Sequence, residues 1–183
     1  VNPHFLFNAL NTLVAVIRRD GDRACELVQN LSTFFRKNLK RSGDEVSLAD
    51  ELEHVNADLQ IELARFADRL EVVVALPQEL LAVRLPAFSL QPTVENAIKH
   101  GTSQLLGVGR IDIGARLEGG CLLLQVTDNA GLFQSQPNNS GLGMNLVDKR
   151  IRVRYGDAYG VQVACEPQTF TRITINVPLA RAA

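Results

Sequence analysis

The first 43 residues show a helical pattern of hydrophobic positions. Large aliphatic residues recur at intervals of three and four, as on one face of an amphipathic helix: Leu6, Leu10, Leu13 and Ile17. Asp20-Gly21-Asp22 interrupts the pattern, and a second apolar stripe runs from Leu27 to Leu39. Two helices joined by a short turn predict an antiparallel hairpin. Because a hairpin cannot enclose its own apolar stripe, we expect it to pair with a second copy in a four-helix bundle.

A boundary is expected at Ser42-Gly43-Asp44, which separates residues 1–43 from residues 44–183. Ser47 then has the character of a helix N-cap, and Asp50 and Glu51 place acids in the first turn, where the helix dipole favours them. The third helix is predicted to end near Phe66.

Beyond Phe66, the pattern changes to strands that alternate with helices. Alternation of apolar and polar residues is clear from Ile111 to Leu117, and Cys121–Thr127 is apolar enough for a central strand. The further segments are strands at 70–76, 161–165 and 170–177 and helices at 87–100 and 141–155. The prediction is an α+β chain, in which the helical hairpin precedes a two-layer α/β sandwich with a mixed sheet.

Composition narrows the functional classes only a little. The chain has 183 residues, a net charge of -1 and 46% hydrophobic residues, which allows one sizeable core and gives no electrostatic case for direct nucleic-acid binding. Three widely spaced cysteines predict small buried residues in a reducing compartment. There is no signal peptide or membrane-length apolar run. Because the chain begins at Val1, inside a motif, we expect it to be part of a longer protein.

The segment LQPTVENAIKHG, from Leu90 to Gly101, is the first candidate for chemistry. On a helix, Glu95, Asn96, Lys99 and His100 are predicted to share roughly one side. A carboxamide oxygen beside cations suits Mg²⁺ and phosphate. The alternative is a solvated polar helix face with a capping histidine.

The segment VTDNAG, from Val126 to Gly131, is the second candidate. Asp128 emerges from the end of a predicted buried strand into a turn, where its carboxylate is placed to meet a ligand. Asp, Asn and Gly are also the usual residues of an ordinary β-turn, so that interpretation stays open.

The segment SGLGMNLVDKR, from Ser140 to Arg150, is the third candidate. Gly141 and Gly143 at the head of a helix leave backbone N–H groups open to an anion, which the helix dipole also favours. The P-loop motif with its lysine is absent from the chain. The alternative is an ordinary junction between a loop and a helix.

The order of the three segments resembles the ATP-binding domain of the gyrase, Hsp90, histidine kinase and MutL superfamily. Within that superfamily, they resemble the N-box and the two glycine boxes of sensor histidine kinases. NPHFLFNALNTL near the N-terminus and Arg65-Phe66 narrow the resemblance to the LytS/YehU-type bacterial sensor kinases. The resemblance covers essentially the whole chain.

This resemblance implies a role for each matching residue. His4 is implied as the phosphoacceptor, Asn96 as the Mg²⁺ ligand, and Asp128 as the acceptor for the adenine amino group. Glu95 is implied only as a base or metal neighbour. The other implied ATP-binding residues are Lys99 and His100 near the phosphates and the glycines Gly131, Gly141 and Gly143, with residues 130–140 as the lid.

Three positions depart from the general histidine-kinase pattern. Phe5 stands where an acid often follows the phosphoacceptor, so the general base is not identified. Ala130 stands where a glycine is common in the first glycine box. Pro92 stands where many N-boxes carry a second asparagine, which agrees with the LytS/YehU pattern.

The implied activity is that of an ATP-dependent protein-histidine kinase that acts as a homodimer with ATP and Mg²⁺. The phosphoryl group would pass from histidine to an aspartate of a response regulator of the LytTR type, and the chain would be the cytoplasmic portion of an inner-membrane sensor. The basic residues Arg36, Lys37, Lys40 and Arg41 would meet this regulator or simply complement a helix C-terminus. Two alternatives stay open: an ATPase that drives a conformational change, and a pseudokinase scaffold without catalysis.

Overall fold

A computed structural model describes residues 3–40, 45–133 and 142–179. In this part of the chain the α-helices are α1 (Pro3–Ile17), α2 (Gly21–Lys40), α3 (Leu48–Phe66), α4 (Leu90–Asn96) and α5 (Leu142–Tyr155). The strands are β1 (Glu45–Ser47), β2 (Leu70–Ala75), β3 (Arg84–Pro86), β4 (Gly109–Glu118), β5 (Cys121–Asp128), β6 (Gly160–Glu166) and β7 (Phe170–Pro178). Short helical turns lie at Ala67–Arg69, Gln78–Leu80, Ala97–Gly101 and Thr102–Gln104.

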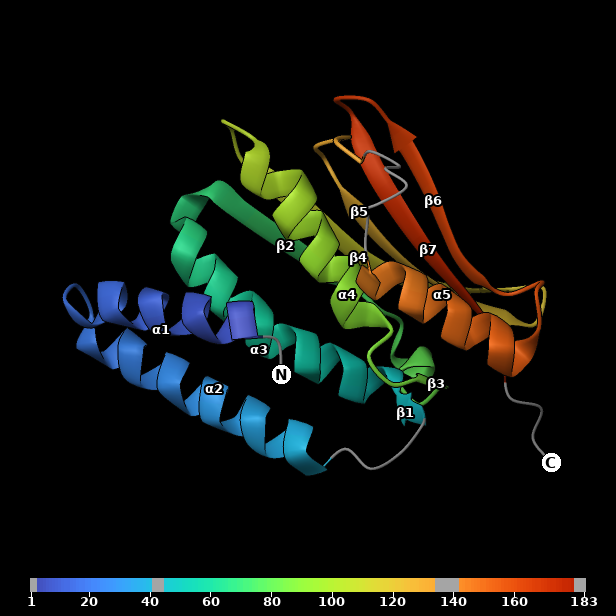
Figure 1. Cartoon of the computed structure of the whole chain (residues 1–183), viewed down its shortest axis with the longest axis horizontal. Helices are drawn as coiled ribbons and strands as arrows, with labels where there is room; N and C mark the ends of the chain where they lie inside the picture. The colour runs from blue at the N-terminus through green and yellow to red at the C-terminus, as the bar shows by residue number, and fades with distance from the viewer. Residues whose placement is uncertain (1–2, 41–44, 134–141, 180–183) are drawn as a thin grey trace.

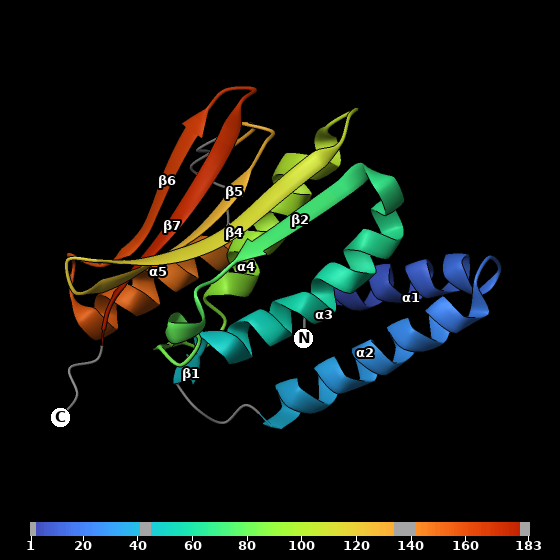
Figure 2. The same cartoon turned by 180° about the vertical axis from the view of Figure 1, so that it is seen from behind.

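The predicted helical hairpin is confirmed as α1 and α2. The carboxylate of Asp20 accepts a hydrogen bond of 2.9 Å from the Arg23 backbone N–H, so the predicted helix breaker is the N-cap of α2. Both helices lie along α3 on the side away from the sheet (Figures 1 and 2). A hydrophobic cluster joins the three helices: Ala9, Leu13, Leu27, Leu31 and Ile61.

The prediction of one apolar stripe on α1 is wrong in one respect. Leu13 is buried against α2 and α3, whereas Leu10 is 47% exposed and Ile17 is 58% exposed. Exposed Val14 lies between them on the same face, so α1 carries two apolar faces, of which only one packs within the chain. The side chain of Leu6 lies outside the described residues.

The start of α3 follows the predicted capping pattern. The Asp50 backbone N–H donates to Ser47 Oγ, and the Ser47 backbone N–H donates to Asp50 Oδ2, each over 3.1 Å. Just before this cap, β1 pairs with β3 in a two-stranded antiparallel sheet that the sequence did not predict. Arg154 and Tyr155 of α5 both donate hydrogen bonds to Glu45, which ties this small sheet to the second half of the chain.

The main sheet has five strands in the order β2-β4-β5-β7-β6. β2 and β4 are parallel and the other neighbours are antiparallel, which confirms the predicted mixed sheet. α4 and α5 cover one face, and the opposite face is open (Figures 1 and 2). β5 occupies the centre, as its apolar sequence predicted, and its side chains alternate between buried and half-buried.

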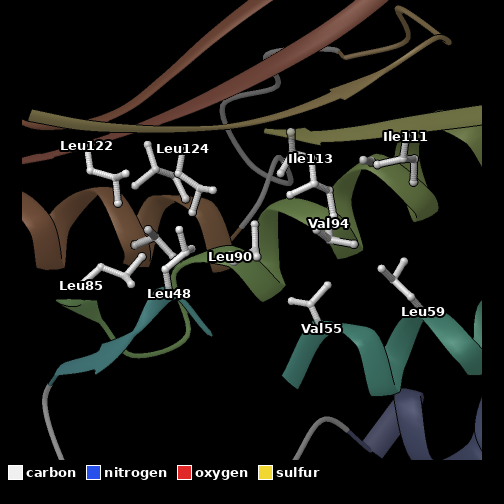
Figure 3. Close-up of a cluster of buried hydrophobic side chains, with 14 of the residues drawn as sticks. Leu48, Val55, Leu59, Leu85, Leu90, Val94, Ile111, Ile113, Leu122 and Leu124 are labelled. Carbon is white, nitrogen blue, oxygen red and sulfur yellow. The ribbon is translucent and has the colours of Figure 1, made fainter. Parts of the chain in front are cut away.

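The main core lies between this sheet and the helices (Figure 3). Leu122 and Leu124 of β5 point from the sheet toward Leu90 of α4 and Leu48 of α3, and each of these side chains is fully buried. α3 therefore contributes to both hydrophobic clusters, one with the hairpin and one with the sheet. Burial of each such leucine stabilises the fold by about 1.5–3 kcal/mol.

Two further expectations need correction. The helix predicted from Ala87 begins at Leu90, because Phe88 has a positive φ of 60° and Ser89 precedes the first helical residue. The cysteines are not buried: Cys25 and Cys165 are exposed and Cys121 is intermediate. Cys25 follows the inward-facing Ala24 on α2 and therefore points outward. No helix in the described part of the chain has the length and hydropathy to cross a membrane.

Candidate functional site

The first candidate segment forms α4 and a wider helical turn after it. Asn96 is the last residue of α4, and Lys99 and His100 lie in the π-turn Ala97–Gly101. Both of these side chains are exposed, and the Asn96 side chain is half-buried and makes no hydrogen bond in the described part of the chain. Turns of the π type are rare in proteins, and those that occur often lie at functional sites.

Glu95 makes its hydrogen bond on the α3 side of α4. Its carboxylate accepts a hydrogen bond of 2.9 Å from Gln91 Nε2, and the Gln91 side chain contacts α3. Lys99 and His100, in the π-turn that follows Asn96, are exposed, whereas Glu95 is half-buried.

Asp128 lies at the end of β5, and only 2% of its surface is exposed. Its Oδ1 accepts hydrogen bonds from the backbone N–H groups of Ala130 at 2.9 Å and Gly131 at 3.3 Å. Burial raises the pKa of this carboxyl, and hydrogen bonds from Ala130, Gly131 and Thr171 act in the opposite direction. The carboxylate is therefore held in a fixed orientation at the C-terminal end of the central strand.

Gly101 brings the first and second segments together. A Cβ atom placed on Gly101 would lie only 2.9 Å from Asp128 Cγ and 3.0 Å from Asp128 Oδ2. The end of the π-turn thus packs directly on the buried carboxyl group, which brings the segment that carries Asn96 next to Asp128. In the sequence, Gly101 stood out only as the last residue of the first candidate segment.

Thr171 of β7 is the other contact to Asp128 that the sequence did not indicate. It is buried and hydrogen-bonds to the Asp128 carboxylate from the neighbouring strand. Its only signal in the sequence is a polar residue at an inward position of an alternating strand.

Gly131 has a structural role that its sequence motif did not show. Its φ is +59°, and an added Cβ would lie 2.6 Å from the Thr169 backbone nitrogen. Its carbonyl accepts a hydrogen bond of 3.1 Å from the Gln168 backbone N–H. A glycine here lets the turn between β6 and β7 pack against the end of the Asp128 segment.

Gly143 in the first turn of α5 lies against the first turn of α4. An added Cβ would lie 3.1 Å from Pro92 Cβ, so the third candidate segment is packed beside the first. Gly141 and the loop at 134–140 lie outside the described residues, as does the side chain of His4. The backbone of His4 belongs to the first turn of α1.

A buried carboxylate braces the start of α4. Glu51 is 1% exposed and accepts hydrogen bonds from the backbone N–H groups of Phe88 at 2.8 Å and Leu90 at 2.9 Å. Arg150 of α5 donates to the Ala87 carbonyl on the same loop. The positive φ of Phe88 is thus fixed by contacts from α3 and α5.

The assembled site has two chemically different ends. Asp128, Gly101 and Thr171 form a buried acceptor, which suits the amino group of a flat base. Asn96, Lys99 and His100 offer a carboxamide oxygen and cationic or neutral donors at a more open position. Mg²⁺ usually takes only one or two protein ligands beside phosphates and water. The residues therefore fit a magnesium nucleotide, although the described residues contain no cluster of three or more His, Cys, Asp or Glu suited to a metal.

Comparison with known proteins shows which proteins the chain resembles. The family model described as "Histidine kinase" matches residues 1–70. The chain is 68% identical over 178 residues to the "Sensor histidine kinase BtsS" of Escherichia coli K12, a match that covers 97% of this chain and 32% of the relative. Over most of its length, the chain is similar to sensor histidine kinases. It is also 40% identical over 191 residues to the "Sensor protein LytS" of Staphylococcus saprophyticus, and it spans about a third (32%) of the length of these relatives.

Solved structures support the fold of this chain. The histidine kinase AdeS of Acinetobacter baumannii matches with a TM-score of 0.57 and 17% identity, over 87% of this chain and 79% of AdeS. The catalytic domain of the histidine kinase ThkA matches with a TM-score of 0.57 and 15% identity, over 74% of this chain and 94% of ThkA. Together with the mixed sheet, these likenesses confirm the predicted α+β architecture.

Proposed function

We propose that this chain is the kinase portion of a two-component sensor, which transfers the γ-phosphoryl group of ATP to its own histidine. A response regulator aspartate then receives the group. The observation that carries the proposal is the buried Asp128 carboxylate in contact with Gly101, in a chain 68% identical to a sensor histidine kinase. That contact joins a base-recognition group to the segment that carries Asn96.

The nucleotide roles follow from the two ends of the site. Asp128 accepts a hydrogen bond from the adenine amino group, and Asn96 holds Mg²⁺ through its carboxamide oxygen. Lys99 and His100 attract the phosphates, and backbone N–H groups at Gly141 and Gly143 donate to them at the start of α5. Gly131 supports the adenine end through its backbone. Mg²⁺ bound to ATP supplies charge neutralisation for phosphoryl transfer.

His4 is the proposed phosphoacceptor. Its backbone lies in the first turn of α1, at one end of the hairpin, and a neutral imidazole nitrogen is the nucleophile in this proposal. Residues 1–43 form the dimerisation and phosphotransfer unit in this proposal, and residues 44–183 form the ATP-binding domain.

The partners follow from the same proposal. The exposed apolar face of α1 pairs with a second copy of the chain, and the regulator is of the LytTR type. The chain itself makes no direct contact with nucleic acid. It acts in the cytoplasm as part of a longer sensor at the inner membrane, in keeping with the greater length of its relatives.

Labelling with γ-³²P ATP tests this function. The parent chain should acquire label that is stable in base and lost in acid. His4→Gln should abolish this label while nucleotide binding persists, and Asn96→Ala should reduce both labelling and Mg-ATP binding by at least about tenfold. Gln78→Ala, an exposed change on a distant turn, should label like the parent.

The other functional classes give different outcomes in the same assay. ATP hydrolysis without protein label would indicate an ATPase switch. Capture of a regulator with no label at any Mg²⁺ concentration would indicate a scaffold. Unchanged labelling of His4→Gln would contradict the assignment of the phosphoacceptor.

A further inference from the structure

α3 lies between the helical hairpin and the nucleotide helix α4 (Figure 1). On the hairpin side, Ile61 packs on α1 and α2, and Gln60 Oε1 accepts a hydrogen bond of 3.2 Å from Arg23 of α2. On the α4 side, Val55 and Leu59 belong to the main core. A buried polar network crosses this second contact and ends beside Asn96.

Gln91 is the centre of this network. Its Oε1 lies 2.9 Å from His54 Nε2, and its Nε2 donates to Asp58 Oδ2 at 2.8 Å and to Glu95 Oε1 at 2.9 Å. A carboxamide has one acceptor oxygen and two donor hydrogens, so every kind of polar group on this side chain is used. The two hydrogen bonds from Nε2 fix the amide orientation, which makes His54 Nε2 the donor to Oε1.

Asp58 is the anchor of the network on α3. It is 6% exposed, and burial together with the negative charge of Glu95 raises its pKa to about 8. Glu62 also raises this pKa, and the hydrogen bond from Gln91 lowers it. Asp58 is therefore mostly neutral at pH 7, and its Oδ1 has no hydrogen-bond partner. An asparagine would reproduce this neutral state and keep an acceptor for Gln91.

Asn96 depends on its helix for its position. Its half-buried side chain has no hydrogen bond to another described residue, so its position follows that of the α4 backbone. The preceding residue, Glu95, is tied through Gln91 to Asp58. A change in this tie is expected to move the Asn96 end of the site before it affects Asp128, which is held by β5 and β7.

We propose that Asp58 is a positioning residue for the magnesium and phosphate end of the nucleotide site, where it acts through Gln91 on the last turn of α4. This inference rests on the proposed function. Asp58 itself touches neither nucleotide nor metal. α3 also packs on the hairpin, whose first helix carries His4. The hydrogen bonds from Asp58 through Gln91 to Glu95 therefore connect the packing of the hairpin to the placement of Asn96.

Three variants separate positioning from general stability. Asp58→Leu keeps a similar volume and removes the acceptor, Asp58→Asn keeps the neutral acceptor, and Gln91→Met removes the amide from the other helix. Asn56→Ala, an exposed change on α3, is the matched control. Titration calorimetry measures binding of Mg-ATP and, separately, of ADP in EDTA, and thermal unfolding reports on the fold.

Asp58→Leu and Gln91→Met should each weaken Mg-ATP binding about tenfold, the scale of an outer partner of a metal ligand. Binding of ADP in EDTA should change less than about twofold, because Asp128 still holds the adenine. Asp58→Asn and Asn56→Ala should match the parent for both ligands.

If the variants lose affinity equally for both ligands, or for neither, the positioning role of Asp58 is wrong. The proposed function still stands in that case, because the parent chain binds Mg-ATP. If Asp58→Leu does not fold, Gln91→Met decides the question by the same two titrations. A parent chain that binds neither ligand would refute the proposed function itself, and the positioning role with it.

Discussion

Gly101 is a residue whose missing side chain has a direct consequence for the site. The carboxyl group of Asp128 occupies the space that a Cβ would need, with Asp128 Cγ only 2.9 Å away. The neighbouring carboxylate cannot retreat easily, because backbone N–H groups of Ala130 and Gly131 hold it. The glycine therefore sets the distance between the π-turn and Asp128, the end of the site that we propose holds adenine.

Gly101→Ala is expected to weaken binding of ADP in EDTA by about tenfold, or roughly 1.4 kcal/mol, because Asp128 must shift to admit the methyl group. Titration calorimetry measures this change. Gly107→Ala is the matched control, since nothing lies within 4 Å of an added Cβ there, and it should bind like the parent. Unchanged affinity in Gly101→Ala would show that Asp128 has room to move.

At this scale, the sequence predicted residues that belong to motifs and missed residues that act through contacts. Asp128 was predictable because a carboxylate at the end of an apolar strand stands out. Thr171 was not, because its partner lies on another strand and only the β5–β7 register brings them together. The role of Gln91 was not predictable either, because its partners on α3 are distant in sequence and no periodicity indicates a hydrogen-bond partner.

Among the elements, the start of α4 depends most on a distant group. Glu51 of α3 supplies the acceptors for two backbone N–H groups that precede or begin the helix, at Phe88 and Leu90. In most helices a side chain from the N-cap itself fills this role. The Ser89 hydroxyl instead donates to the Pro86 carbonyl over 2.6 Å.

Glu51→Ala is expected to lower the free energy of unfolding by about 3 kcal/mol, because two buried N–H donors lose their acceptor and a cavity remains. Urea denaturation measures the change. Glu79→Ala, an exposed acid on another short turn, should stay within about 0.5 kcal/mol of the parent. A loss as small in Glu51→Ala as in the control would mean that water replaces the carboxylate.

The same element shows why helix boundaries were harder to predict than helices. The periodic pattern from Ala87 onward is continuous, yet the helix begins at Leu90, because Glu51 and Arg150 hold the loop before it in a non-helical conformation. β1 and β3 were missed for a related reason. Each has three residues, and a pairing that short leaves no alternation to detect.

For the whole molecule, α3 turns two predicted units into one packed chain. The sequence predicted a hairpin that hides its apolar residues only by pairing with another copy. Part of that surface is instead covered by Ile61 of α3, in the cluster with Leu13 and Leu27. The order of layers was predictable from the strand and helix pattern, whereas this contact depends on how the hairpin folds back.

A second apolar face of the hairpin stays uncovered. Leu10, Val14 and Ile17 follow one another at helical spacing on α1, and they are 47%, 60% and 58% exposed. Val28 of α2 adds to the exposed apolar surface of the hairpin and is 49% exposed. A surface of this kind on a two-helix unit is what a four-helix bundle buries when two copies pair.

Val14→Glu is expected to disrupt the dimer, because pairing would bury a carboxylate without a partner. The dissociation constant of the dimer should rise about 100-fold, or roughly 2.7 kcal/mol. Sedimentation equilibrium measures the change. Leu106→Glu provides the control, because that leucine is 100% exposed on a distant loop and the added charge should leave the dimer intact. Nucleotide binding should survive in both variants. For Val14→Glu the reason is that α3 separates the hairpin from α4 and β5, which carry Asn96 and Asp128 (Figure 1). A Val14→Glu chain that dimerises like the parent would place the dimer contact on another surface.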